Sequence, residues 1–184
     1  MLFRSEETLA HFESVKLRLE TAGFRVLDVP AMSDYKEIYE RHFLILAAEA
    51  AAVHREWFGE FSELYREKTA ELIEKGRAIK DDQLAPALEG RGQLRKELLV
   101  LMEEYGIDAW ISPAAPGPAP QGIEATGDPA MNLPWTHCGL PTIGLPSGWS
   151  SDRLPLGIQL TGKWYGDERV LAEAVAVERA LTED

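Results

Sequence analysis

The sequence predicts an α/β protein in which helices cover a sheet of about four short strands. Over the first 107 residues, apolar side chains recur mainly at three- and four-residue spacing, which is typical of amphipathic helices. Nine of the 11 Pro and nine of the 15 Gly residues fall between residues 113 and 166, where short apolar runs indicate strands joined by turns. We therefore expect one domain over residues 1–184, mostly helical over 1–107, with strands, Pro/Gly loops and a final helix over 108–184.

The helical part begins with a helix that Ser5 can cap and Gly23 can end. A long second helix is expected after a Ser33 cap. The Gly90-Arg-Gly92 sequence indicates a weak or broken stretch in a later helix, because glycine is a poor helix former. The helices expected after the first cover residues 34–58, 69–79 and 82–105.

Short apolar runs bounded by Pro and Gly mark the strands. The first expected strand contains Phe24, Val26 and Val29 and ends at Pro30. A final helix, capped by Asp167, follows the last strand. The remaining expected strands cover residues 108–112, 141–146 and 155–161, the last two joined by a turn over 148–153.

Charge and cysteine content limit the function classes. The formal net charge of -12 disfavours binding to nucleic acid or to anionic lipid, because both would be repelled. Cys138 is the only cysteine, so neither an intrachain disulfide nor a cysteine-based zinc cluster can form. No apolar run is long enough to span a bilayer, and the first residues lack the apolar core of a secretory signal. We therefore expect a cytoplasmic protein with no nucleic-acid or membrane partner.

Metal and nucleotide chemistry have no motif in this sequence. The four histidines, His11, His42, His54 and His137, form no HExxH pair. No GxxxxGK[ST] loop is present to cradle a phosphate. We expect no metal ligand and no cofactor.

Nucleophilic catalysis has only weak candidates. His137 and Cys138 are adjacent, and neighbours in sequence rarely bring their side chains together. Ser147 follows Pro146 and is not part of a GxSxG elbow. The residues alone therefore indicate no catalytic constellation, although an independent hydrolase using His137 and Cys138 remains one hypothesis.

The second part of the chain carries an ordered series of motifs. They are Asp108-Ala-Trp-Ile-Ser-Pro113, Thr126-Gly-Asp128, Asn132-Leu-Pro-Trp135, Gly139-Leu-Pro141, Leu145-Pro-Ser-Gly148, Leu154-Pro-Leu-Gly-Ile-Gln-Leu160 and Gly166-Asp-Glu168. In this order and spacing they resemble the C-terminal part of the amidase signature family, the Ser-Ser-Lys hydrolases of carboxamide C–N bonds that include the A subunits of glutamyl-tRNA amidotransferases. Residues 19–26 resemble the family's helix-to-strand step, so the similarity extends over nearly the whole chain.

The resemblance implies a partial amidase domain, which supplies half of a central mixed sheet and one wall of the substrate pocket. The family's nucleophilic Ser, relaying Ser and Lys base lie in a longer N-terminal part, ahead of anything this sequence matches. The sequence has no Gly-Gly-Ser-Ser-like run, so we expect the chain alone to be inactive and assign it no catalytic residue.

The same resemblance implies three substrate-binding candidates. In the amidotransferase members of the family an Asp shortly before Gly-Leu-Pro recognises a polar group of the substrate, and Asp128 resembles that position. Asn132 and Trp135 lie on the same segment and can line the same wall. The alternative is that Asp128 caps a turn and Trp135 fills the core. We expect Gln159 to satisfy buried backbone groups.

Two functions follow from the sequence. The first is the C-terminal segment of an amidase-family hydrolase, which would handle a small amide substrate only when completed by a chain carrying the N-terminal catalytic part. The second is a non-catalytic interaction module, or one half of a split enzyme, that pairs with a partner chain. Because the face that meets the N-terminal part would be apolar and exposed, we also expect self-association into a homo-oligomer.

Overall fold

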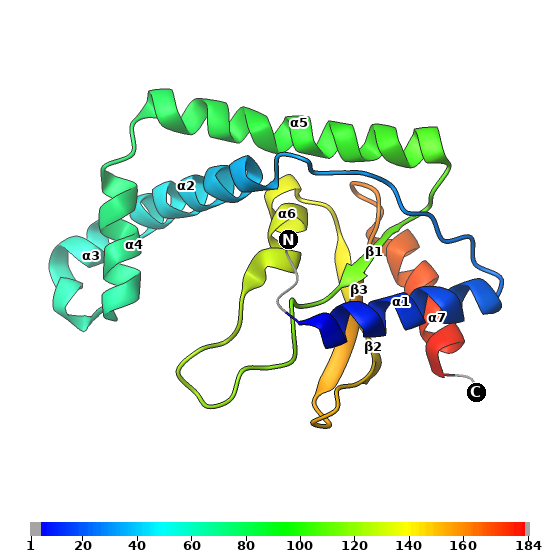
Figure 1. Ribbon diagram of the computed structural model, residues 1–184. Coiled ribbons are helices and arrows are strands. Elements are labelled where there is room, and N and C mark those ends of the chain that lie inside the picture. The colour runs from blue at the N-terminus through cyan, green and yellow to red at the C-terminus, as the bar shows by residue number, and fades with distance from the viewer. Residues whose placement is uncertain (1–4, 183–184) are drawn as a thin grey trace. The chain divides into compact units, whose positions relative to one another are not determined.

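A computed structural model describes residues 5–182, which form two compact units (Figure 1). Residues 5–31 and 97–182 make up the first unit, and residues 32–96 make up the second. The first unit contains α1 (Glu6–Thr21), β1 (Trp110–Pro113), the 3-10 helix η2 (Pro129–Met131), α6 (Leu133–Cys138), β2 (Thr142–Trp149), β3 (Pro155–Thr161) and α7 (Asp167–Thr182). The second contains α2 (Tyr35–Val53), α3 (Arg55–Phe61), the 3-10 helix η1 (Ser62–Leu64) and α4 (Glu67–Arg77), while α5 (Asp81–Tyr105) begins in the second unit and ends in the first.

The first unit is built on a three-stranded sheet in the order β1-β3-β2. The central strand β3 pairs antiparallel with both neighbours, and Gln159 lies opposite Ser112 on one side and Gly144 on the other. A bulge between Pro146 and Gly148 shifts the register near the end of β2. Because side chains alternate along a strand, Gln159 points to one face of the sheet and its neighbours Ile158 and Leu160 point to the other.

The helices α1 and α7 cover the face that carries Ile158 and Leu160 (Figure 1). The apolar side chains of α1 and α7 recur at helical spacing, which gives each helix one face to bury against the sheet. Full burial of each large side chain contributes roughly 1.5–3 kcal/mol. The resulting core consists of Val15, Leu19, Leu145, Ile158, Leu160, Val170, Ala174, Val177 and Leu181.

The α/β fold class predicted from the sequence is confirmed, and α1 forms as expected. Ser5 Oγ accepts a hydrogen bond of 3.2 Å from the Thr8 backbone N–H, and Gly23 ends the helix with φ of 91°. The expected Asp167 cap is wrong. Asp167 is the first residue of α7, and Gly166 O accepts from Val170 N in the first turn.

The strand predicted around Phe24, Val26 and Val29 does not form. Phe24 N donates to Leu19 O, which closes the end of α1, and Phe24 and Val26 pack against the core as loop residues. The apolar pattern therefore reflects contact with the core rather than strand pairing. Within residues 5–182 the sheet has three strands, and their pairings are antiparallel rather than mixed.

In the second unit, the helix predicted over residues 34–58 is divided at His54 into α2 and α3. His54 Nδ1 lies 2.9 Å from Tyr65 Oη, and the Phe58 ring packs edge-on against Tyr65 at 5.1 Å between centroids. These contacts turn α3 toward α4, where Phe58 joins Ile73 in a small core. The expected Ser33 cap is also wrong, because Asp34 precedes the first helical residue.

Two glycines of the second unit lie where helices pack closely. A Cβ at Gly76 of α4 would stand 1.9 Å from the Ala47 carbonyl oxygen of α2. A Cβ at Gly90 would stand 2.7 Å from the Arg41 side chain. The helix does not break at Gly90 and Gly92, since α5 is continuous there, and the weak helix that the two glycines indicate stays a prediction.

We expect Gly76→Ala to lower the free energy of unfolding by roughly 1–3 kcal/mol or more, because the added methyl group overlaps backbone atoms that cannot rotate away. Gly92→Ala is the matched control. A Cβ there meets open space, so the variant should gain up to about 1 kcal/mol from helix propensity. Urea denaturation followed by far-UV circular dichroism measures the free energy of unfolding of both variants. Equal stability of the two variants would contradict the packing of α4 on α2.

In the first unit, a partly buried hydrogen bond joins α1 to β2. His11 Nε2 lies 2.8 Å from Ser147 Oγ, and Ser147 Oγ also lies 3.3 Å from Leu156 O, which can only accept. When the serine hydroxyl donates to Leu156 O, a His11 Nε2–H donates to the serine oxygen; the tautomer of His11 sets this direction. Burial lowers the pKa of His11, with a further contribution from the positive charge of Arg18.

Since the folded-state pKa of His11 lies below its ordinary value of 6.5, the folded state binds fewer protons than the unfolded state. The resulting stability is complete above pH 6.5 and is lost as the pH falls through the folded-state pKa. We expect His11→Gln, which keeps a donor but cannot be protonated, to lose less stability than the natural chain on acidification. Urea denaturation at pH 8 and pH 5 tests this. Part of the acid sensitivity should remain in the variant, because burial also lowers the pKa of His42. If the free energies of unfolding of the natural chain and of His11→Gln differ by the same amount at pH 8 and at pH 5, His11 does not cause the loss of stability in acid.

Candidate functional site

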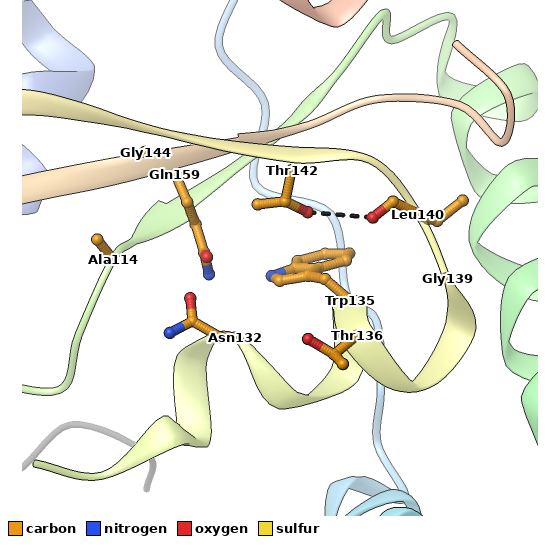
Figure 2. A pocket seen from close by; sticks show the side chains of 9 residues that line it. All are labelled: Ala114, Asn132, Trp135, Thr136, Gly139, Leu140, Thr142, Gly144 and Gln159. Atoms are coloured by element: carbon orange, nitrogen blue, oxygen red, sulfur yellow. Dashed lines mark hydrogen bonds between the residues drawn. The ribbon is translucent and has the colours of Figure 1, made fainter. Parts of the chain in front are cut away.

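A hollow of about 460 Å³ lies on the sheet face opposite α1 and α7 (Figure 2). The floor is made by strands β2 and β3, and α6 stands beside it. A Cβ at Gly144 would meet open space, so the absence of a side chain there helps to keep the hollow open. The lining residues are Ala114, Asn132, Trp135, Thr136, Gly139, Leu140, Thr142, Gly144 and Gln159.

The Gln159 side chain fixes the segment before α6 against the sheet. Its Nε2 donates to Ser112 Oγ at 2.9 Å and to the Met131 carbonyl oxygen at 2.6 Å. The prediction that Gln159 satisfies a buried backbone group is confirmed by the second bond. Gly139, with φ of 70°, then ends α6 and returns the chain to β2.

Trp135 stands on α6 with its ring against the hollow and only 6% of its surface exposed. The ring lies 6.3 Å from Trp110 between centroids. Its indole nitrogen Nε1 is buried and has no hydrogen-bond partner among the described residues. Figure 2 shows the nitrogen-bearing edge of the ring facing the ends of the Asn132 and Gln159 side chains.

Two of the three predicted binding residues meet at this hollow, and the third does not line it. Asn132 is exposed at the rim with its amide turned toward Gln159, and Trp135 lies beside it (Figure 2). Asp128 Oδ1 accepts a 3.0 Å hydrogen bond from Ala130 N and caps η2, as the alternative interpretation of this residue expected.

The nucleophile candidates lie in the interior. Cys138 is fully buried, and its Sγ lies 3.4 Å from the Trp135 carbonyl oxygen, to which it donates. His137 is buried on the same short helix. Ser147 pairs with His11, a contact across 136 positions that sequence spacing could not indicate, but its hydroxyl is buried under α1.

Metal binding has no candidate site in residues 5–182, where no group of three or more His, Cys, Asp or Glu side chains could hold an ion. None of the helices in this range is long and apolar enough to cross a membrane. The hollow is lined by neutral side chains, and the polar groups of these side chains that can meet a ligand are amides and hydroxyls. Such a set can bind a small polar molecule by hydrogen bonding.

A family model described as Amidase matches residues 4–171. The A subunit of the glutamyl-tRNA(Gln) amidotransferase from Granulibacter bethesdensis is 26% identical over 205 residues, covering 96% of this chain and 41% of that protein. Its counterpart from Oceanobacillus iheyensis is 31% identical over 97 residues, covering 49% of this chain and 20% of that protein. The chain thus spans less than half the length of these relatives.

Solved structures agree in fold. The crystal structure of an amidase superposes with a TM-score of 0.84 at 27% identity and covers 95% of this chain, which spans 42% of that one. A fatty acid amide hydrolase superposes with a TM-score of 0.82 at 19% identity. The superposition covers all of this chain and 38% of the hydrolase. The second similarity concerns the fold alone.

We expect Cys138 to be unreactive toward a thiol reagent such as dithionitrobenzoate in the native chain and to react stoichiometrically in urea, because a thiol without solvent access cannot attack. The absorbance of the released thiolate measures the reaction. The denatured chain serves as the control for reagent quality. Rapid labelling of the folded chain would contradict the buried position of Cys138 and would support the hypothesis of an independent hydrolase that uses this thiol.

Proposed function

Because this chain belongs to the amidase family, we propose that it is the C-terminal segment of a hydrolase of carboxamide C–N bonds. The observation that carries this proposal is the hollow beside α6, since it is lined by the segment that holds the family-like motifs around Asn132 and Trp135. In this proposal the chain forms one wall of the substrate site. A reducing, cytoplasmic setting also belongs to the proposal, because the sequence has a single cysteine.

The proposal assigns the bond-breaking groups to a partner. No activated nucleophile faces the hollow among residues 5–182: its hydroxyls are those of Thr136 and Thr142, and Thr142 Oγ1 lies 2.9 Å from Thr161 Oγ1. An unactivated hydroxyl is a poor nucleophile. A chain bearing the Ser-Ser-Lys part would supply the nucleophile and base, while this chain positions the amide group.

A second candidate is a non-catalytic interaction module, which pairs with itself or with another chain. It is favoured by the apolar side chains that stay exposed in residues 32–96, among them Val53, Trp57 and Leu64 at 72%, 61% and 75%. This candidate predicts association without any contribution to hydrolysis.

We expect the purified chain to release no ammonia from propionamide or benzamide, since residues 5–182 present no activated nucleophile at the hollow. The amidase that is 27% identical to this chain should lose ammonia release when its matching segment is deleted. A chimera that carries this chain in place of the deleted segment should regain ammonia release. The truncated enzyme without the insert is the control.

Three outcomes separate the alternatives. Hydrolysis by the chimera, abolished when the nucleophilic Ser of the N-terminal part is replaced by Ala, supports the amidase segment. A folded chimera without hydrolysis favours the interaction module. Turnover by the isolated chain that disappears in Ser147→Ala or Cys138→Ser would refute both and indicate an independent hydrolase.

A further inference from the structure

We infer that one apolar face of α2 is the contact surface of a weak, reversible homodimer, in which two copies of α2 pack side by side in antiparallel orientation. The α2 face consists of Tyr39, Phe43, Leu46, Ala50 and Val53. The inference does not rest on the proposed function, because α2 belongs to residues 32–96 and the hollow belongs to the other unit. It goes beyond the interaction-module candidate, since it names the face, the partner and the direction of pairing.

The α2 helix carries apolar side chains on the side that it buries and also on the side that it exposes. Its buried apolar residues are Ile38, Ile45, Ala47 and Ala51. Gly76 of α4, which lies beside α2 in the same unit, packs against Ala47 and Ala51 (Figure 1). From residue 43 to residue 53, Glu49 is the only charged residue. A helix that is apolar all round is normally buried all round, so the α2 face lacks the polar cover of an ordinary surface helix.

The α2 face has the spacing of a seam between two packed helices. Its five residues are separated alternately by four and three positions, which places them in one stripe along the helix. Tyr39, Leu46 and Val53 are 39%, 39% and 72% exposed, while Phe43 and Ala50 between them are half-buried. The Tyr39 and Phe43 rings pack on each other at 4.6 Å between centroids. The stripe is therefore ordered within one chain and suited to a second helix.

The distribution of charge favours a second copy of this chain as the partner. Residues 32–96 carry 11 basic and 13 acidic side chains, whereas the rest of the chain carries a net charge of -10. Two copies that meet through residues 32–96 bring nearly neutral surfaces together, while a contact through the other residues would bring two strongly acidic ones together. The Glu49 carboxylate lies 3.5 Å from Arg91 Nη1, which offsets its charge within each copy.

The α2 face is also complementary to a reversed copy of itself. When two antiparallel α2 helices are aligned about position 48, residue 46 of one copy lies opposite residue 50 of the other, and residue 43 lies opposite residue 53. Larger side chains then face smaller ones, because Leu46 meets Ala50 and Phe43 meets Val53. A parallel pair would place each residue against its own counterpart, which crowds one layer with two Phe rings and leaves another with two Ala methyl groups.

The size of the α2 face sets the strength of the dimer. The face is about 21 Å long, because an α-helix rises 1.5 Å per residue from Tyr39 to Val53. It exposes apolar surface on the order of several hundred Å². A stable complex buries about 800 Å² on each partner. We therefore expect a dissociation constant on the order of 100 μM, so that the chain is monomeric when dilute and dimeric when concentrated.

Sedimentation equilibrium of the full chain, from about 10 μM to about 1 mM, tests the inference. Leu46→Glu places on the α2 face a charge that the dimer would have to desolvate, so the dissociation constant should rise about tenfold or more. Leu88→Glu is the matched control, because Leu88 is 41% exposed on α5 in the same unit and is not part of the face. This control should dimerise as the natural chain does. Far-UV circular dichroism verifies that both variants fold.

Disulfide trapping tests the direction of pairing. In the antiparallel pair, residue 53 lies opposite residue 43 of the other copy and about 15 Å along the helix from its own counterpart. Oxidation of a mixture of Phe43→Cys and Val53→Cys should therefore link one chain of each kind, whereas Val53→Cys alone should stay unlinked. The natural Cys138 does not compete, because it is fully buried.

Three results would overturn the inference. They are a natural chain that stays monomeric at about 1 mM, equal dissociation constants for Leu46→Glu and Leu88→Glu, and faster linking of Val53→Cys alone than of the mixture. A monomeric chain whose Leu46→Glu variant no longer restores ammonia release in the chimera would mean that the N-terminal part covers the α2 face instead. A monomer that binds phosphatidylcholine vesicles through Leu46 would assign the face to a lipid surface. A dimer together with an inactive chimera would reject the amidase segment and leave the dimer in place.

Discussion

The first unit depends on the alternation of side chains along β3. Ile158 and Leu160 point to one face, where α1 and α7 exclude water, and Gln159 between them points to the other. Because Gln159 is in the central strand, its amide can reach both β1 and the segment before α6. One strand thus defines an apolar face that packs into the core and a polar face that lines the hollow, and a shift of register by one residue would exchange them.

Local patterns predicted most of the fold. The cap at Ser5, the left-handed Gly23 and the Pro- and Gly-bounded strands after residue 108 are signals carried by a few neighbouring residues. The wrong predictions required distant contacts. Residues 24–29 look like a strand because their apolar side chains pack on the core, and the helix break at His54 is accompanied by contacts with Tyr65, 11 positions away.

The candidate site was only partly predictable for the same reason. Asn132 and Trp135 stand on a recognisable motif, and both line the hollow. The part played by Gly144 could not be foreseen, because it follows from its position opposite Gln159 in the sheet register. The pairing of His11 with Ser147 likewise depends on how α1 crosses the sheet rather than on any spacing in the sequence.

The first unit is discontinuous along the chain, and this has a consequence for its synthesis. Residues 32–96 leave the ribosome as one uninterrupted stretch and can fold while the remainder is still being made. The α1 helix must wait, because the strands and the α7 helix that cover its apolar face all lie after residue 109 in the chain. During that interval its side chains Val15 and Leu19 are without their native cover, so the nascent chain is most exposed to misassociation before its C-terminal helix emerges.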